Sequence, residues 1–246
     1  MDKLGGPETY NHYAWGWTFA GNTLFRRWKR ETYRGGISDP FIVHWPRGIE
    51  AKCEIRTQYA HAIDMVPTVL ECLGIEPPTT IKGVSQSPIE GVSFAHTFGD
   101  VNTPTKHRTQ YFEMMGHRSL YHDDWRAVCS WPGPSFTEAG KPFGEPIPAD
   151  TLTELDAKGW ELYRVEKDWA ENYNVAAENR SKLIEMISIW YAEAVKYNVL
   201  PIDSRGVLRG FDERPGIAKN ITHLYLLPWN SGDPRNCSSQ RSQPFA

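Results

Sequence analysis

Five cationic side chains stand close together in the stretch NTLFRRWKRETYRGGISDPFIVHWP, which spans residues 22–46. They are Arg26, Arg27, Lys29, Arg30 and Arg34, and a Gly-Gly pair and an apolar run closed by proline follow them. Such a cluster could bind phosphates, because affinity for a polyanion grows with the number of phosphates that are neutralised. It is short, however, and no recognition motif accompanies it, so the sequence predicts no nucleic-acid partner.

Lys29 allows two further interpretations. A lysine just ahead of a glycine pair and a buried strand could lie at the carboxyl edge of a sheet, where α/β enzymes bind their ligands. Its ammonium group would then neutralise an anionic substrate. A solvated lysine is the commoner outcome. The residue types and their spacing leave both open.

Metal-compatible side chains occur together in one other stretch, at His117, His122, Asp123 and Asp124. Their spacing matches no zinc or calcium pattern, and an Asp-Asp pair between two strand-like segments is better explained as a turn. His61 and Asp64, three residues apart ahead of a predicted helix, fit a capping role. The sequence therefore predicts no metal site.

No nucleophile is evident. The chain has no G-x-S-x-G motif, and none of its cysteines lies near an obvious base. The four cysteines, Cys53, Cys72, Cys129 and Cys237, contain no C-x-x-C pair, which argues against a zinc site or a disulfide framework and favours buried free thiols.

Composition limits the possible partners. The 246 residues carry a formal net charge of -3, from 27 Lys+Arg and 30 Asp+Glu, and this balance does not favour a polyanion. No apolar stretch approaches the roughly 20 residues that cross a bilayer, and the first residues have no signal-peptide core. The sequence is that of a soluble globular protein with no membrane partner, and it leaves the compartment unknown.

The elements around Lys29 follow from apolar patterns. Residues 1–34 predict loop with short helical pieces, and the run FIVHW at 41–45 predicts a short strand buried on both faces. In YAHAIDMVPTVLECLGI, the four residues Val66, Val69, Leu70 and Leu73 share a helical face, and Gly74 is placed as the helix stop. Residues 76–106, rich in proline and glycine, predict a long irregular connection.

The second half of the chain predicts an antiparallel meander. The segments TQYFEMM, RSLYHDDWRAVCS and WELYRV alternate with turn signals at Gly116 and 122–124, and a Pro/Gly-rich surface loop is expected between Trp131 and Gly159. A long helix over SKLIEMISIWYAEAVKYNVL should cover one face of the sheet. Its predicted apolar face is Leu183, Ile184, Ile187, Trp190, Tyr191, Ala194 and Val195.

Taken in order, these segments resemble the C-terminal part of a bacterial-type arylsulfatase, a formylglycine-dependent sulfatase of the alkaline-phosphatase-like superfamily. The likeness runs through LGGPETYNHYAWGW, K-R-E-T-Y-R-G-G, QYAHAIDMVPTVLECLGI, YFEMMGHRSLYHDDWRAV, WELYRVEKDWAENYNVA and WYAEAVKYNVLPID. It is lost from about residue 229.

The resemblance implies an α/β fold in which the end of a sulfatase domain precedes a small α+β subdomain. That subdomain would be an antiparallel sheet packed by a long C-terminal helix. The implied boundaries are 1–105 for the catalytic portion, 106–228 for the subdomain and 229–246 for an aberrant tail that is disordered or weakly docked.

The resemblance also implies sulfate ester hydrolysis. Lys29 matches the family's sulfate-contacting lysine, and Tyr10, His12, Tyr13 and Trp17 are candidates for the aromatic part of the substrate pocket. The family's formylglycine comes from C-x-P-x-R and its calcium is held by ligands that include a D-N-G motif, yet neither motif occurs here. The nearest case, Cys237 to Arg241, has serine in place of the required proline.

We therefore expect a sequence truncated at its N-terminal side and inactive by itself, with the missing half as a possible partner. Two alternatives stay open. A phosphodiesterase or phosphonate hydrolase of the same superfamily would share this C-terminal architecture. A non-catalytic interaction fragment would use the sheet and the amphipathic helix to bury a partner's surface.

Overall fold

The computed structural model describes residues 3, 6–9, 13–50, 53–130, 149–200 and 202. All of them belong to one compact unit, Met1–Arg209. No helix in these ranges is both long and apolar enough to cross a bilayer.

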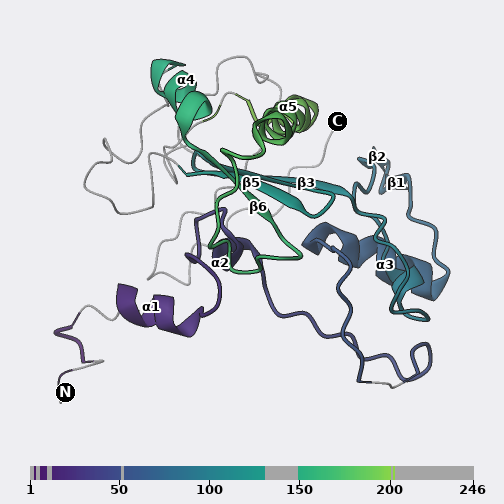
Figure 1. Ribbon diagram of the computed structural model, residues 1–246. Helices are drawn as coiled ribbons and strands as arrows, with labels where there is room; N and C mark the ends of the chain where they lie inside the picture. Colours follow the sequence, from purple (N-terminus) through teal and green to yellow (C-terminus); the bar gives the residue numbers. More distant parts are fainter. Residues whose placement is uncertain are drawn as a thin grey trace, which may run out of the picture. The chain divides into compact units, whose positions relative to one another are not determined.

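An antiparallel meander forms the centre of this unit (Figure 1). Its strands are β3 (Thr109–Met114), β4 (His117–His122), β5 (Trp125–Cys129) and β6 (Trp160–Arg164), hydrogen-bonded in that order. Two-residue turns at Met115-Gly116 and Asp123-Asp124 join the first three strands, and all four turn residues have positive φ. Turns with two positive φ values match the twist of a hairpin. The predicted meander and both predicted turns are confirmed.

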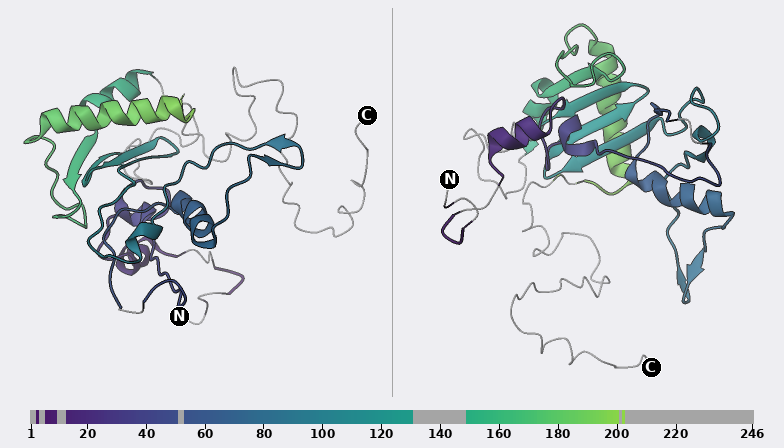
Figure 2. Two further views of the ribbon diagram at one scale, coloured as in Figure 1. Left: turned by 90° about the vertical axis from the view of Figure 1, so that its right-hand side faces the viewer. Right: turned by 90° about the horizontal axis from the view of Figure 1, so that it is seen from below.

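Helix α5 (Arg180–Lys196) covers one face of this sheet (Figure 2). Leu183, Met186, Trp190 and Ala194 point into the core, where they meet Leu120, Ala127, Cys129 and Leu162 from the strands. The predicted helix is confirmed, but the set of residues predicted for its buried face is partly wrong. Ile184 and Val195 are exposed, because the 3.6-residue period places the buried face at Met186 instead.

Helix α4 (Ala149–Lys158) lies within the stretch that was predicted to be a surface loop, so that prediction is wrong for these residues. The sequence ADTLTELDAK is rich in helix formers, with Asp150 in the first turn and Lys158 in the last, where both charges favour the helix dipole. Residues 131–148 of the same stretch lie outside the described residues.

Shorter elements precede the sheet. Helix α1 (Trp15–Gly21) confirms a short helical piece within residues 1–34, and helix α2 (Arg34–Ile37) begins at the end of that range. The irregular connection contains a small hairpin of β1 (Thr80–Ile81) and β2 (Val84–Ser85), and the 3-10 turn η2 (Ala95–Thr97). Another 3-10 turn, η1 (Ala62–Asp64), leads into helix α3 (Met65–Leu73).

The start of this η1–α3 segment is capped as the sequence predicts. The Asp64 carboxylate accepts a hydrogen bond from the backbone N–H of His61 at 2.8 Å, and His61 Nδ1 accepts one from the N–H of Ile63 at 3.4 Å. The shared apolar face of α3 does not enter the core, since Val66, Val69 and Leu73 are all exposed. Helix α3 therefore presents an apolar surface to solvent.

Gly74 ends α3 in the left-handed conformation, with φ of 64°. A Cβ atom at this position would meet nothing within 4 Å, so only the backbone conformation opposes a side chain. We expect Gly74→Ala to lower the free energy of unfolding by about 1 kcal/mol, measured by urea denaturation. Gly99→Ala is the matched control, because Gly99 is equally open and lacks a positive φ. Equal losses in the two variants would contradict this explanation.

The buried strand predicted at residues 41–45 does not form. Residues 41–45 form no strand, and Ile42 is 88 % exposed. A buried strand needs a hydrogen-bonding neighbour on each side, and the described residues supply none for this run.

Of the thiols predicted to be buried, Cys129 is buried, whereas Cys53 is exposed and Cys72 only half-buried. Cys237 lies outside the described residues.

Candidate functional site

Lys29 stands on a loop of residues 26–31, here called the Lys29 loop, between α1 and α2. The side-chain amide of Asn22 donates to the carbonyl oxygens of Arg27 (2.5 Å) and Gly35 (2.9 Å), which ties the start of the loop to α2. The N–H of Gly35 also donates to the carbonyl of Arg26 at 3.0 Å. These hydrogen bonds to backbone carbonyls fix the loop, while the Lys29 side chain is exposed.

The glycine pair after Lys29 has a steric reason. A Cβ atom on Gly35 would lie 2.1 Å from the carbonyl oxygen of Arg27, and one on Gly36 would lie 2.0 Å from that of Glu31. Real Cβ atoms do not approach a backbone oxygen so closely. Only glycine at both positions allows α2 to pack directly against the Lys29 loop.

Trp28 attaches α1 to the same loop. Its ring meets Trp15 edge-on, with 4.6 Å between centroids, and Phe19 at 6.4 Å. Tyr13 and Trp17, two of the predicted pocket residues, are 69 % and 70 % exposed. Within the described residues, no hydrogen bond or ring contact joins either of them to Lys29, so their role stays a prediction. Tyr10 and His12 lie outside the described residues.

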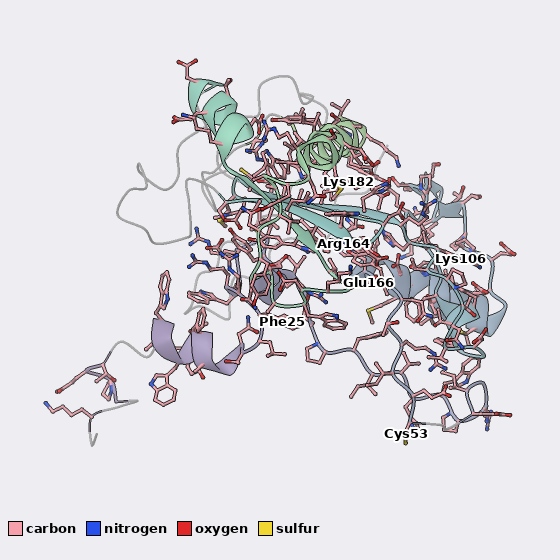
Figure 3. All side chains as sticks on the ribbon, in the orientation of Figure 1. Phe25, Cys53, Lys106, Arg164, Glu166 and Lys182 are labelled. Atoms are coloured by element: carbon pink, nitrogen blue, oxygen red, sulfur yellow. The ribbon has the colours of Figure 1, made fainter. Side chains whose placement is uncertain are left out.

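The side chains of Arg26 and Arg34 make structural contacts with other parts of the chain. Arg26 Nη1 donates to the hydroxyl of Tyr163 (2.7 Å) and to the carbonyl of Glu171 (2.8 Å). The guanidinium of Arg34 lies 4.6 Å from the Trp169 ring centroid and 5.2 Å from that of Phe25, a ring found beside α2 in Figure 3. Burial lowers the pKa of Arg34. Within the described part of the chain, no hydrogen bond or ion pair engages Lys29.

A buried ion pair fastens this region to the sheet face opposite α5. Arg126 Nε lies 2.7 Å from Glu171 Oε1, and Arg126 Nη2 donates to the carbonyl of Thr32 at 2.5 Å. The other Glu171 oxygen accepts the N–H of Arg34 at 2.8 Å. Arg126 is 3 % exposed and Glu171 0 %. Sequence reasoning missed both residues, although an arginine inside the apolar strand WRAVC was an available signal.

Two tyrosines extend the contact between loop and sheet. Tyr33 Oη donates to Glu161 Oε2 at 2.8 Å, and Tyr163 Oη donates to the same oxygen. Burial, helped by the Glu161 charge, raises the pKa of both tyrosines far above the ordinary value, so both hydroxyls stay protonated donors at neutral pH. Arg26 of the Lys29 loop and Tyr33 just after it therefore contact a polar part of the sheet face.

The metal-compatible side chains of the second half do not all meet at one point, although His122 Nε2 lies 3.5 Å from an oxygen of Asp123. His117 and His122 point to opposite faces of β4, because an odd separation along a strand reverses the side chain. His117 Nδ1 faces Glu31 Oε2 at 3.4 Å, whereas His122 Nδ1 pairs with Thr109 Oγ1 at 2.7 Å. Asp123 is paired with Arg108. Among the described residues, no three His, Cys, Asp or Glu side chains are grouped as metal ligands.

A cavity of about 670 Å³ runs along the outer edge of β3. All six residues of β3 line it, together with His61, His107 and the end of the Lys29 loop at Arg30 and Glu31. Cations such as Lys106 and acids such as Glu113 both reach it, so its charge selects no ligand. Lys29 is not among its lining residues.

Residues 24–119, which include the Lys29 loop, α2 and α3, match the family described as N-sulphoglucosamine sulphohydrolase, C-terminal. These residues therefore resemble the C-terminal part of a sulfatase. The observed small α+β subdomain, with its antiparallel sheet under a long helix, agrees with the fold that the sequence resemblance implied. The division near residue 105 stays a prediction.

Three solved structures are similar to parts of this chain. BT4656, solved in complex with its substrate D-glucosamine-2-N,6-O-disulfate, is 18 % identical over 67 % of this chain and 29 % of its own, with a TM-score of 0.39. BT33336S-sulf, from work on glycosaminoglycan metabolism by Bacteroides thetaiotaomicron, is 22 % identical over 70 % and 32 %, with a TM-score of 0.46. Ps i-CgsB is 16 % identical over 63 % and 28 %, with a TM-score of 0.38. The chain thus spans about a third or less of each solved chain.

Proposed function

We propose that this chain supplies the sulfate-contacting lysine of an arylsulfatase-type sulfuric ester hydrolase. The observation that carries the proposal is the arrangement of the Lys29 loop. Its backbone is fixed by Asn22 and by the glycine pair, while the Lys29 ammonium group extends into solvent. The Arg26 side chain is hydrogen-bonded to Tyr163 of the sheet and the Arg34 guanidinium stacks on Trp169 and Phe25, whereas the Lys29 side chain is exposed on this loop.

Sulfate ester cleavage gives such a lysine a clear role. The ester is an anion, and negative charge builds up on oxygen as the sulfur–oxygen bond breaks. A cation that is already in position stabilises this charge without reorganisation, and most strongly where water is excluded. Lysine offers a compact point charge on a long stem, so it can reach a sulfate from a loop.

Formylglycine and calcium, which the sulfatase resemblance implies, do not fit the residues of this chain. The sequence has no C-x-P-x-R motif, and the described residues bring no metal-ligand cluster together. We therefore assign neither the attacking group nor the calcium ligands to this chain. In our proposal both come from polypeptide outside this sequence, the other half of the sulfatase.

An exposed apolar surface supports a contact with that polypeptide. Phe41, Ile42 and Val43 are exposed in the run that follows α2, and Phe41 makes a T-shaped contact with Phe94 at 5.6 Å between ring centroids. The exposed face of α3 adds further apolar area. Exposed apolar patches of this kind typically mark interaction sites. They would be buried when the catalytic half docks.

The purified chain alone is expected to hydrolyse no 4-nitrophenyl sulfate above background, because it lacks a nucleophile. Adding a separately expressed sulfatase N-terminal half that carries C-x-P-x-R should restore release of 4-nitrophenol. N-sulfoglucosamine belongs in the same assay, since the matched family is named for it, and so do a phosphate diester and a phosphonate ester. Turnover by the chain alone that Lys29→Ala abolishes would contradict the need for a second half. Turnover of only the phosphorus esters would contradict the sulfatase assignment.

A further inference from the structure

A buried ion pair joins the start of α3 to the sheet. His107 Nδ1 lies 2.9 and 2.8 Å from the two carboxylate oxygens of Asp64, and His107 Nε2 lies 3.1 Å from the carbonyl oxygen of Thr109. His107 is 7 % exposed and Asp64 0 %. The pair belongs to neither the Lys29 loop nor the exposed apolar surface.

The geometry fixes the protonation state of this histidine. A carboxylate and a backbone carbonyl can only accept hydrogen bonds, and each faces a different ring nitrogen. A neutral imidazole carries one N–H, so one of its nitrogens would turn a lone pair towards an oxygen. The imidazolium form, with two N–H groups, satisfies both contacts.

Asp64 links further segments to the same point. Its carboxylate also accepts the N–H of Val92 at 2.7 Å, in addition to the N–H of His61. Its carbonyl accepts the hydroxyl of Thr68 at 2.6 Å, and Thr68 Oγ1 in turn accepts the N–H of Phe94 at 3.0 Å. The η1–α3 segment, the 92–94 segment and β3 therefore meet at the His107–Asp64 pair.

We propose that protonated His107 is a pH-sensitive clasp that fastens the η1–α3 segment to β3. When the proton leaves, one of the two contacts is lost and a buried carboxylate loses its counter-charge. The η1–α3 segment, which carries the exposed apolar face, then separates more readily from the sheet. The clasp is independent of the proposed sulfatase activity.

The groups around the His107 ring determine the direction in which its pKa is shifted. Burial alone would lower the pKa of His107, but the hydrogen bond and charge of Asp64 outweigh it and raise that pKa. For Asp64, burial is likewise outweighed, by its hydrogen bonds with His107, Val92 and His61, and its pKa is lowered. Burial lowers the pKa of His61, whose ring centroid lies 6.3 Å from that of His107. The remaining neighbours are Tyr59, at 5.4 Å between ring centroids, and Gln110 of β3.

These shifts define a pH window. Stabilisation by His107 is fully present below its unfolded pKa of about 6.5 and is lost as pH rises through the raised folded pKa. Stabilisation by Asp64 is present above its unfolded pKa of about 3.9 and is lost as pH falls through the lowered folded pKa. The clasp should therefore be strongest between about pH 4 and 6.5.

The test is nitrogen NMR of the full chain with ¹⁵N-labelled histidine, titrated from pH 5.5 to 9. We expect both ring nitrogens of His107 to carry protons at pH 6.5 and to lose one only above the ordinary histidine pKa of about 6.5. Over the same range, protection of the Val92 amide against hydrogen exchange, corrected for the intrinsic rate, should fall by about tenfold. A single N–H on His107 at pH 6.5, or unchanged Val92 protection through the titration, would overturn the proposal.

Variants separate the clasp from general stability. His107→Gln should remove the pH dependence of Val92 protection and leave it low throughout. His44→Gln, the matched control on an exposed histidine, should keep the wild-type profile. A His107→Gln variant that retained the pH-dependent change would assign it to another group and overturn the clasp. Should that variant fail to fold, the ring titration of the unaltered chain decides.

Discussion

Arg126→Leu should lower the free energy of unfolding by about 3–5 kcal/mol, as measured by urea denaturation. The substitution leaves Glu171 as an uncompensated charge with 0 % exposure. It also removes the donor to the Thr32 carbonyl, which connects the sheet to the segment following the Lys29 loop. This one guanidinium therefore supports both the sheet face and the position of the candidate site.

Two further variants show whether the cost comes from the stranded charge. Arg126→Leu combined with Glu171→Leu should recover much of the lost stability, because a buried ion pair replaced by apolar groups is close to neutral. Arg108→Leu removes an arginine whose pair with Asp123 is exposed, and it should cost little. If the Arg126 and Arg108 variants lose equal stability, burial is not the cause.

Lys29→Ala should reduce kcat of the assembled two-part sulfatase by about 10²–10³, the loss typical when one group that stabilises transition-state charge is removed. The unfolding free energy of this chain should not change, because the Lys29 side chain is exposed. The experiment compares steady-state turnover of a sulfate ester and urea unfolding for the variant and the unaltered chain.

Matched lysines make the result specific. Lys158→Ala removes an exposed lysine at the end of α4 and should leave turnover unchanged. Lys29→Arg keeps the charge but replaces a point charge by a planar fork, so we expect partial activity. Full activity of Lys29→Ala in an assembly that is active with the unaltered chain would remove Lys29 from the mechanism.

The sequence by itself determined the elements whose signals are local. Alternating residues, Gly116 and the Asp123-Asp124 pair specified the meander, because period-two patterns and positive-φ turns depend on neighbours a few residues away. The α3 cap and the Gly74 stop were predicted for the same reason. The family resemblance added the sulfatase assignment and the choice of Lys29.

The tertiary structure decided which of the cationic side chains in residues 26–34 are engaged in structural contacts and which are exposed. Five cations within nine residues look alike in the sequence, and only contacts with residues more than 100 positions away, Tyr163 for Arg26 and Trp169 for Arg34, distinguish these two arginines from Lys29. Arg126 could not be paired with Glu171 from the sequence, because the fold brings them together across 45 residues. The exposed run at 41–45 follows the same rule, since apolar residues become a buried strand only where other strands pair with them.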